Sequence, residues 1–395
     1  MKGSKLYLML AVLYSLYFLV YIHRTVTGVL KPELTQIAES NSFDVALLSS
    51  ALASAYFYAY SAMQLPAGVL ADALGVRRYV AISAGVMTAG ALLFATANPY
   101  PMLAGRLLIG AGAAAVYVSI QRIIGVYAPR DKGGLLTGLA LAVGNLGALF
   151  ATLPARMLLD SLGFPAFFAA LTVASGALSL VPLRTIGDEG LSSRGFLEGL
   201  KQTISQLKVV AASYHSIAVA LAYTGTYSAV LAFQSYWAYE YMQRGFGLSK
   251  GEAAQALLLL ALAFLATVPI VGYVSDSVLK KRKPILVASC FLHSAAWLAA
   301  VLLPATGSVP LLQLYMLMLG GIAATHIVIS PMAREAYPSE FSGTTFAFVN
   351  MVGFLTVAVY QSLGAILNDP QPVLIVFSVA SLISGILSIR AKETL

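Results

Sequence analysis

Polar and ionisable side chains recur on one face of several long apolar segments. Residues 6–30 carry such a face, at steps of three or four residues that an α-helix would align: Tyr14, Tyr17, Tyr21, Arg24 and Gly28. A guanidinium group stays protonated at any accessible pH, so Arg24 inside an apolar helix must meet water, a counter-charge or an anionic ligand. The pattern predicts a polar cavity in which Arg24 binds an anion. The alternatives are a side chain that reaches the membrane surface, or a pair with backbone carbonyls or an acid.

Three further apolar segments carry comparable faces, and we expect them to line the same cavity. Their polar members are Tyr117, Gln121 and Arg122 in 101–128; Tyr223, Tyr227, Gln234 and Trp237 in 213–243; and His326 and Ser330, with Arg334 at the end of the face, in 308–334. For any single tyrosine, packing with its hydroxyl bonded to a neighbouring helix is an equally good explanation. Arg122 near its helix end is compatible with ligand contact or with a salt bridge at the membrane surface.

Enzymatic chemistry has no support in the sequence. The four histidines occur singly, and the sequence lacks His-Glu-x-x-His, Gly-x-Ser-x-Gly and the Walker phosphate-binding loop. No cluster has the spacing of metal ligands, and the single cysteine, Cys290, excludes an internal disulfide. We expect no enzymatic activity, no cofactor and no metal.

The composition indicates which elements carry these faces. Of 395 residues, 59% are hydrophobic and 10% are charged, whereas an ordinary soluble domain has about 25% charged residues. Apolar segments long enough to cross about 30 Å of hydrocarbon lie near 6–30, 44–71, 79–97, 101–128, 133–159, 165–185, 213–243, 250–277, 284–303, 308–334, 341–367 and 371–390. We predict an all-α integral membrane protein with twelve transmembrane helices in two six-helix bundles, residues 1–185 and 213–395.

Residues 186–212 form the predicted linker between the bundles. Apolar residues recur there at helical spacing while the charged ones point elsewhere, which is typical of an amphipathic helix on a membrane surface; they are Phe196, Leu197, Leu200, Ile204, Leu207 and Ala211. An ordinary solvated linker is the alternative.

The basic residues predict the orientation. Most of the 24 Lys and Arg lie at the chain ends and in the loops of one side, and such an excess marks the cytoplasmic side. We therefore expect a multi-pass protein of the cytoplasmic membrane, with both termini in the cytoplasm. A net charge of +8 could indicate a nucleic-acid partner, but most of the basic residues lie on one side of the predicted membrane. We therefore expect a lipid bilayer and no nucleic acid as partner.

A short loop occurs twice in the chain. Residues 68–78 read Gly-Val-Leu-Ala-Asp-Ala-Leu-Gly-Val-Arg-Arg, and a second version occupies 272–282, about half the chain later. The loop resembles the G-x-x-x-D-x-x-G-R-R/K loop of the major facilitator superfamily, which joins helices 2 and 3 and, in weaker form, helices 8 and 9. The resemblance implies a duplicated six-helix unit and a gate loop comprising Gly68, Asp72, Arg77, Arg78, Asp276, Lys281 and Arg282. In that family the aspartate beside helix 11 stabilises the outward-open state.

Further stretches narrow the resemblance. Residues 56–68, the element Tyr21-Ile22-His23-Arg24 and the run Gly144-Asn145-Leu146-Gly147-Ala148 are similar to a prokaryotic subgroup related to anion:cation symporters, lysosomal dipeptide carriers and a bacterial siderophore carrier. The predicted helix 5 lacks the G-x-x-x-G-P of drug:proton antiporters, which makes multidrug efflux a poorer match. Arg106 before Gly110 matches an R-x-x-x-G element of proton antiporters, although close helix packing through small residues is the preferred explanation.

The resemblance and the faces together predict a monomeric secondary transporter that moves a small organic anion or carboxylate-bearing solute by alternating access. None of the sixteen acids lies near the middle of a predicted helix, where proton symporters usually place one. Facilitated diffusion or exchange is therefore expected rather than proton symport. The alternatives are a proton-coupled carrier of peptides or zwitterions, and a receptor or assembly factor that keeps the fold without transporting anything.

Overall fold

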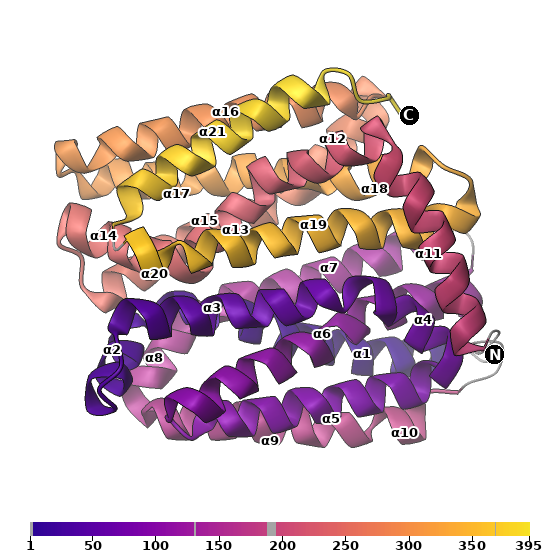
Figure 1. Ribbon diagram of the computed structural model, residues 1–395, viewed down its shortest axis with the longest axis horizontal. Helices are drawn as coiled ribbons and strands as arrows, with labels where there is room; N and C mark the ends of the chain where they lie inside the picture. Colours follow the sequence, from indigo (N-terminus) through magenta and orange to yellow (C-terminus); the bar gives the residue numbers. More distant parts are fainter. Residues whose placement is uncertain (1–2, 130–131, 188–194, 368) are drawn as a thin grey trace.

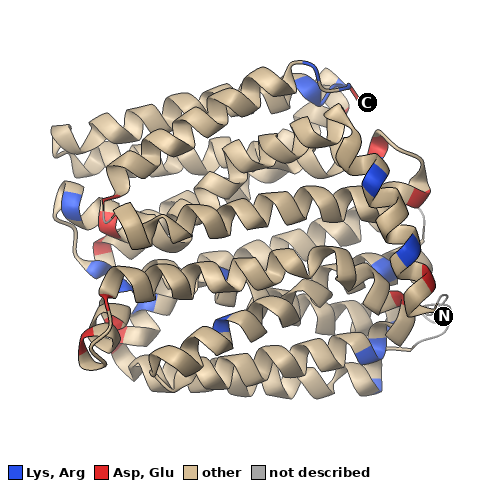
Figure 2. Ribbon diagram, viewed as in Figure 1, with Lys and Arg blue, Asp and Glu red and all other residues tan. Residues whose placement is uncertain are grey.

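The computed structural model describes residues 3–129, 132–187, 195–367 and 369–395, and in these ranges all regular structure is helical. Twelve helices are long and apolar enough to cross a membrane. The predictions of an all-α membrane protein and of twelve spans are confirmed. The helices run side by side, with both termini at one end of the bundle (Figure 1), and the charged residues gather at the two ends (Figure 2).

Ten helices and one 3₁₀ turn precede the linker. They are α1 (Gly3–Thr25), η1 (Val26–Val29), α2 (Lys31–Ser40), α3 (Val45–Ala62), α4 (Gln64–Leu74), α5 (Val76–Ala95), α6 (Pro99–Tyr127), α7 (Gly133–Phe150), α8 (Leu153–Leu162), α9 (Phe164–Leu180) and α10 (Pro182–Thr185). Local chemistry sets several boundaries. The Asp44 side chain accepts a hydrogen bond from the Leu47 N–H at the start of α3, and Gly75, at φ 75°, allows the tight turn between α4 and α5.

The linker helix α11 (Phe196–Ala212) and a second series of helices follow. The series comprises α12 (Tyr214–Tyr223), η2 (Thr224–Ser228), α13 (Ala229–Ala232), η3 (Phe233–Trp237), α14 (Ala238–Phe246), α15 (Lys250–Tyr273), η4 (Val274–Leu279), α16 (Lys283–Leu302), η5 (Leu303–Thr306), α17 (Val309–Ala323), η6 (Ala324–Val328), α18 (Ile329–Glu335), η7 (Ser339–Phe341), α19 (Ser342–Ser362), α20 (Gly364–Leu367) and α21 (Pro370–Ser388). The helices before and after α11 occupy opposite halves of the view in Figure 1.

Helix α11 packs against the bundle through its small and polar residues. Gly199 contacts Val69 of α4, and the Gln206 side chain donates to the Glu340 carbonyl and accepts from the Thr344 hydroxyl, at 3.1 and 2.6 Å. Four large apolar residues are exposed, Phe196, Leu197, Ile204 and Val209, whereas Val210 is buried and Leu200 and Leu207 of the predicted face are half-buried. An outward apolar face on a helix at the end of the bundle fits contact with a membrane surface.

The end of the bundle that carries both termini and α11 is called the termini side below, and the opposite end, with α2 and α14, the far side (Figure 1). The two halves approach closely toward the far side. A Cβ atom on Gly28 of η1 would lie 2.1 Å from the Gln234 carbonyl oxygen of η3, inside any normal contact. Glycine at position 28 thus permits backbone contact between the two halves.

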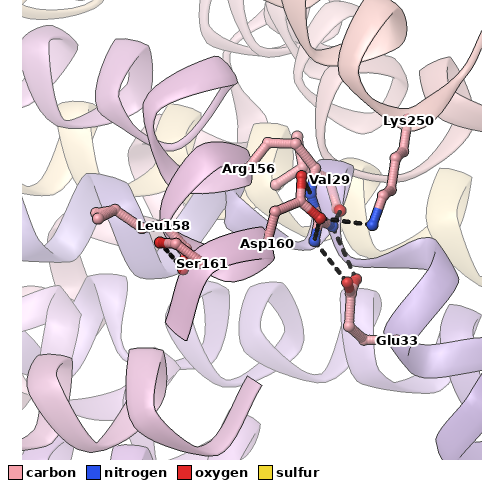
Figure 3. A network of polar contacts seen from close by, with 7 residues as sticks. All are labelled: Val29, Glu33, Arg156, Leu158, Asp160, Ser161 and Lys250. Carbon is pink, nitrogen blue, oxygen red and sulfur yellow. Dashed lines mark hydrogen bonds and ion pairs between the residues drawn. The ribbon is translucent and has the colours of Figure 1, made fainter. Parts of the chain in front are cut away.

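Ion pairs join the halves beyond this contact. Lys31 lies 3.6 Å from Glu240, and Lys250 pairs with Asp160, 2.5 Å away. Figure 3 shows the second cluster, in which buried Arg156 reaches the Val29 carbonyl, Glu33 and Asp160. These contacts hold the end of η1, helix α8 and the start of α15 together, so the far side is closed.

Asp160 titrates below its ordinary range in this cluster. Burial alone would raise the pKa of its carboxyl, but hydrogen bonds from Lys250 and Arg156 and their charges hold that pKa below its usual 3.8. A lowered pKa means that Asp160 stabilises the closed far side fully above pH 3.8, and that this contribution is lost only as the pH falls through the lower value. At neutral pH the ion pair is therefore intact.

The contact at Gly28 gives a first prediction. Gly28→Ala places a methyl group against the Gln234 carbonyl, so η1 and η3 must separate and the far side should stay open. A cysteine at Ser50, which is buried on helix α3, should then react faster with a water-soluble thiol reagent in a background lacking Cys290. Gly85→Ala is the matched control, because nothing lies within 4 Å of the added atom. Equal labelling of the two variants, at unchanged melting temperature, would contradict the prediction.

The ion pair between the halves gives a second prediction. Asp160→Asn should weaken far-side closure by about 0.2 to 1 kcal/mol, as for other exposed pairs, which is up to about a five-fold change in the closed-to-open ratio. The same cysteine labelling measures it. Glu252→Gln is the control, because among the described residues the Glu252 carboxylate bonds to Ser249 of its own helix cap and to no residue of the other half. A shift of the same size in the control would assign the effect to lost surface charge in general.

Candidate substrate cavity

A cavity of about 700 Å³ lies between the two halves. Its walls come from helices α1, α3, α6, α7 and α12, the turns η2 and η6, and helices α18 and α19, and it extends to termini-side residues that include Gly125, Gly133, Asp276 and Glu335. Toward the far side it ends below the contact between η1 and η3. The cavity is therefore accessible from the termini side alone in this conformation.

Arg24 lies deep in this cavity and is 2% exposed. Its guanidinium carbon lies 4.4 Å from the ring centroid of Tyr21, 4.9 Å from that of Tyr60 and 5.0 Å from that of Phe354. It makes no ion pair with the described residues, and its Nε and Nη2 atoms have no hydrogen-bond partner there. A buried guanidinium with free donors can bind an anion.

Close packing of α7 on α1 holds the polar face of α1 at the cavity. A Cβ atom on Gly147 of α7 would lie 2.3 Å from the Phe18 carbonyl oxygen, and one on Gly144 2.8 Å from the Tyr21 ring. The two glycines of the Gly-Asn-Leu-Gly run thus let α7 approach α1 closely. That approach fixes the helix carrying Tyr17, Tyr21 and Arg24.

A second buried arginine supports α1 from behind. Arg106 donates from Nε to the Leu52 carbonyl at 2.8 Å and from Nη1 to the His23 carbonyl at 2.7 Å. It therefore ties α6 to α3 and to the turn of α1 that carries Arg24. A Cβ atom on Gly110 would lie 2.2 Å from the Tyr56 carbonyl oxygen, so this glycine permits close packing of α6 on α3.

Aromatic rings form much of the remaining wall. Tyr17 stacks on Tyr117 with ring centroids 5.5 Å apart. On the opposite wall, the His326 ring stacks on Tyr227 at 4.1 Å and its Nδ1 atom lies 3.1 Å from the Ala323 carbonyl oxygen. Tyr223 packs at 5.8 Å from Tyr227. The wall thus offers apolar faces with hydroxyl, amide and imidazole groups between them.

The structure brings most of the expected binding residues together on this wall. Those that line the main cavity are Tyr17, Tyr21, Arg24, Tyr117, Gln121, Tyr223, Tyr227, His326 and Ser330. Four others lie elsewhere. The Tyr14 hydroxyl donates to the Leu136 carbonyl, and the Trp237 indole, buried in the second half, donates to the Tyr360 carbonyl. Gln234 borders a small void of about 20 Å³ toward the far side, and Arg122 pairs with Asp72.

A side cavity of about 380 Å³ adjoins the main one at the termini side. Gly68 and Asp72 of α4 line it together with Gly343 and Thr344 at the start of α19. In this conformation Asp72 pairs with Arg122 of its own half. The start of α19 belongs to the other half and lines the same side cavity.

The second copy of the loop makes a separate ion-pair group. Arg282 is buried and pairs with Asp276 at 3.3 Å and with Glu335 at the end of α18. Arg77, Arg78 and Lys281 are exposed on the termini side. The aspartates of both copies thus pair with an arginine of the same half.

Sequence reasoning missed several residues of the wall. They are Tyr60, Thr137, Phe346, Asn350 and Phe354, from α3, α7 and α19. Two signals were available. Tyr60 follows Tyr56 by four residues, which places both on one face of a helix, and Asn350 is a polar amide in a predominantly apolar segment.

Comparisons with known proteins agree with this architecture. One curated relative is the L-fucose-proton symporter of Escherichia coli (strain K12), 26% identical over 155 residues, or 38% of this chain. That match spans 34% of the relative's own length.

Solved structures cover nearly the whole chain. A D-xylose-proton symporter superposes with a TM-score of 0.78 at 15% identity, covering 98% of each chain. The xylose transporter XylE from E. coli, in a partially occluded inward-open conformation, gives 0.74 at 13% identity over 99% of each chain. The human organic anion transporter MFSD10 (TETRAN) gives 0.67 at 17% identity, covering 97% of this chain and 99% of that one. At these identities the likeness shows the fold. A family model described as Major Facilitator Superfamily matches residues 13–359, and this chain belongs to that superfamily of membrane transporters.

Proposed function

We propose that this protein carries a small organic anion or another carboxylate-bearing solute across the cytoplasmic membrane by alternating access. The observation that carries the proposal is Arg24, a buried guanidinium on the cavity wall without a carboxylate partner among the described residues and with two unsatisfied nitrogens. Leaving a charge buried and unpaired costs several kcal/mol, and cation–π contacts return only about 0.5 to 2 kcal/mol. A bound carboxylate would supply the missing charge and two acceptors.

The charges around the cavity favour an anion over a cation. The acids on its lining are Asp276 and Glu335, both at the termini side and both paired with Arg282. Among the described residues, the deep part thus offers a cation no carboxylate, and it places the positive charge of Arg24 there. In the proposed cycle, the two six-helix units, residues 1–185 and 213–395, rock about the cavity as a monomer, with the basic termini side in the cytoplasm.

A neutral sugar is the second candidate. Stacked aromatic rings beside Gln121 and Asn350 suit the apolar faces and hydroxyls of a sugar ring, and the printed names of a curated relative and of two structural neighbours refer to sugars. A sugar would leave the guanidinium of Arg24 uncompensated, so we rank it below a carboxylate.

Two further alternatives are compatible with the fold. A proton-coupled carrier of peptides or zwitterions would use Arg24 for the carboxylate end and would need an acid for the ammonium end. A receptor or assembly factor with this fold would bind a ligand without moving it. A thermal-shift screen with gluconate, succinate, benzoate, phosphate, dialanine and D-glucose separates the ligand classes, because a ligand of the folded state raises its melting temperature. Counterflow of that ligand in proteoliposomes then separates a transporter from a receptor.

We also infer uniport or exchange rather than proton symport. A proton-coupled cycle usually needs a carboxylate in the deep part of the cavity, where its charge state can respond to the substrate. The described acids of this chain lie instead at helix ends or in the ion pairs of the two sides, and His23 and His326 are the titratable imidazoles near the cavity.

Substitution of Arg24 tests the anion assignment. Arg24→Ala should abolish binding and uptake of the carboxylate that shifts the melting temperature most, and Arg24→Lys should weaken binding about 10- to 100-fold because an ammonium cannot grip a carboxylate with two parallel N–H donors. Arg184→Ala, at an exposed termini-side arginine, is the matched control. Near-normal uptake by folded Arg24→Ala would rule the assignment out. If D-glucose raises the melting temperature of Arg24→Ala as much as that of the wild type, the result favours the sugar.

Energy coupling is tested in proteoliposomes. An inward proton gradient, with a protonophore as control, should not drive accumulation of the labelled carboxylate above its outside concentration, because the described residues place no carboxyl in the deep part of the cavity to carry the proton. Counterflow against excess internal substrate should still occur. Gradient-driven accumulation that disappears in His23→Ala or His326→Ala would show that an imidazole couples transport to protons.

A further inference from the structure

The cavity has a second arginine without a counter-charge. Four arginines line the main or the side cavity: Arg24, Arg122, Arg282 and Arg334. Arg122 pairs with Asp72, and Arg282 pairs with Asp276 and Glu335. Arg334 makes no ion pair with the described residues, as is true of Arg24.

We propose that Arg334 forms a second anion site at the termini-side mouth of the cavity and receives the substrate carboxylate after it leaves Arg24. This inference rests on the proposed function, since both sites take the same carboxylate. It adds an intermediate step to the path between the deep site and the termini side.

The geometry of Arg334 suits this role. Its guanidinium carbon lies 4.3 Å from the ring centroid of Phe346, which covers one face of the planar group. Its buried Nε has no hydrogen-bond partner in the described structure. A stacked guanidinium keeps its in-plane donors free, and these donors match the two oxygens of a carboxylate. Arg334 lines both the main and the side cavity, so an anion can reach it from either.

An unbroken series of rings connects the two arginines. The Arg24 guanidinium lies over Tyr21 at 4.4 Å. Successive ring centroids are then 4.9 Å apart for Tyr21 and Tyr17, 5.5 Å for Tyr17 and Tyr117, and 5.6 Å for Tyr117 and Phe346. The apolar part of a small carboxylate can follow this wall while its charge passes from one arginine to the other.

The separation of the two sites indicates that they act in succession. Arg24 contacts Phe354, and Arg334 contacts Phe346 on the same helix α19. Eight residues of helix correspond to about 12 Å at 1.5 Å per residue. A single carboxylate group cannot bind both guanidinium groups when their contact points lie that far apart along α19, so it must leave one before it binds the other.

Arg334 has a plausible structural role that the test must separate from anion binding. Asp72 lines the same side cavity, so closure of the termini side can bring Arg334 to an acid of the other half. In that case Arg334 would act as a latch, and its loss would change the conformational balance rather than the affinity at one side.

Homoexchange in oriented proteoliposomes distinguishes the two roles. Labelled gluconate, succinate and benzoate are each varied on one side while the other side is saturated, for wild type, Arg334→Gln, Arg334→Lys and Arg24→Ala. Arg184→Gln, at an exposed termini-side arginine, is the matched control. We expect Arg334→Gln to raise the termini-side half-saturation concentration about tenfold, as for loss of one charge-assisted contact, with less than about a two-fold change at the far side. Arg334→Lys should recover part of the loss.

Three results would overturn the proposal. If the half-saturation concentrations of Arg334→Gln and Arg184→Gln are equal on both sides, no anion binds at Arg334. Equal losses on both sides, together with altered labelling of the Ser50→Cys far-side probe, would identify a latch. Failure of all three carboxylates to bind wild-type protein, with a response to D-glucose, would instead reject the proposed anion transport, and this second site with it.

Discussion

A guanidinium group held inside the bilayer is the constraint on which the rest of this structure depends. It cannot lose its proton, so each buried arginine needs a partner. Arg106 uses two backbone carbonyls, from Leu52 and His23, and becomes a structural tie between helices. Arg24, one residue from that tie, has aromatic rings around it and open donors toward the cavity. One arginine orders the helices, and the other is the group that we propose binds the ligand.

Departures from regular α-helix occur where the two halves meet. The span from Tyr214 to Phe246 contains two π-helical segments, η2 and η3, and the span ending at Glu335 contains the 3₁₀ segment η6. Tyr227 lies on η2 and His326 on η6, and their rings stack on each other in the cavity wall. Irregular backbone at membrane depth is tolerated where it lines a cavity. The same irregularity in η3 turns the Gln234 carbonyl toward Gly28, so one helix contributes both to the wall and to far-side closure.

The composition and periodicity of the chain were sufficient for the spans and for much of the wall. Hydrocarbon thickness fixes the length of a crossing helix, so twelve apolar runs predicted twelve spans. Helical spacing also fixes which side chains share a face, and for this reason the sequence alone predicts that Tyr17, Tyr21 and Arg24 lie together. The same arithmetic failed at Trp237, which follows two π-helical segments whose wider turns shift the register, and its indole donates to the Tyr360 carbonyl instead. Gln234 keeps to the side of Tyr227 and Tyr21, but it borders a separate small void toward the far side.

The sequence by itself determined the fold class, the two copies of the loop at 68–78 and 272–282 and the presence of an arginine inside the apolar helix α1, because these follow from local composition and period. The tertiary structure decided which charges find partners. Arg122 adjoins Gln121 in sequence, yet a step of about 100° around the helix turns it from the cavity face toward Asp72. Arg334 lies beside Glu335, which pairs instead with Arg282, fifty-odd residues earlier. Pairing of charges depends on which helices become neighbours, and that is set by packing over the whole bundle rather than by spacing along the chain.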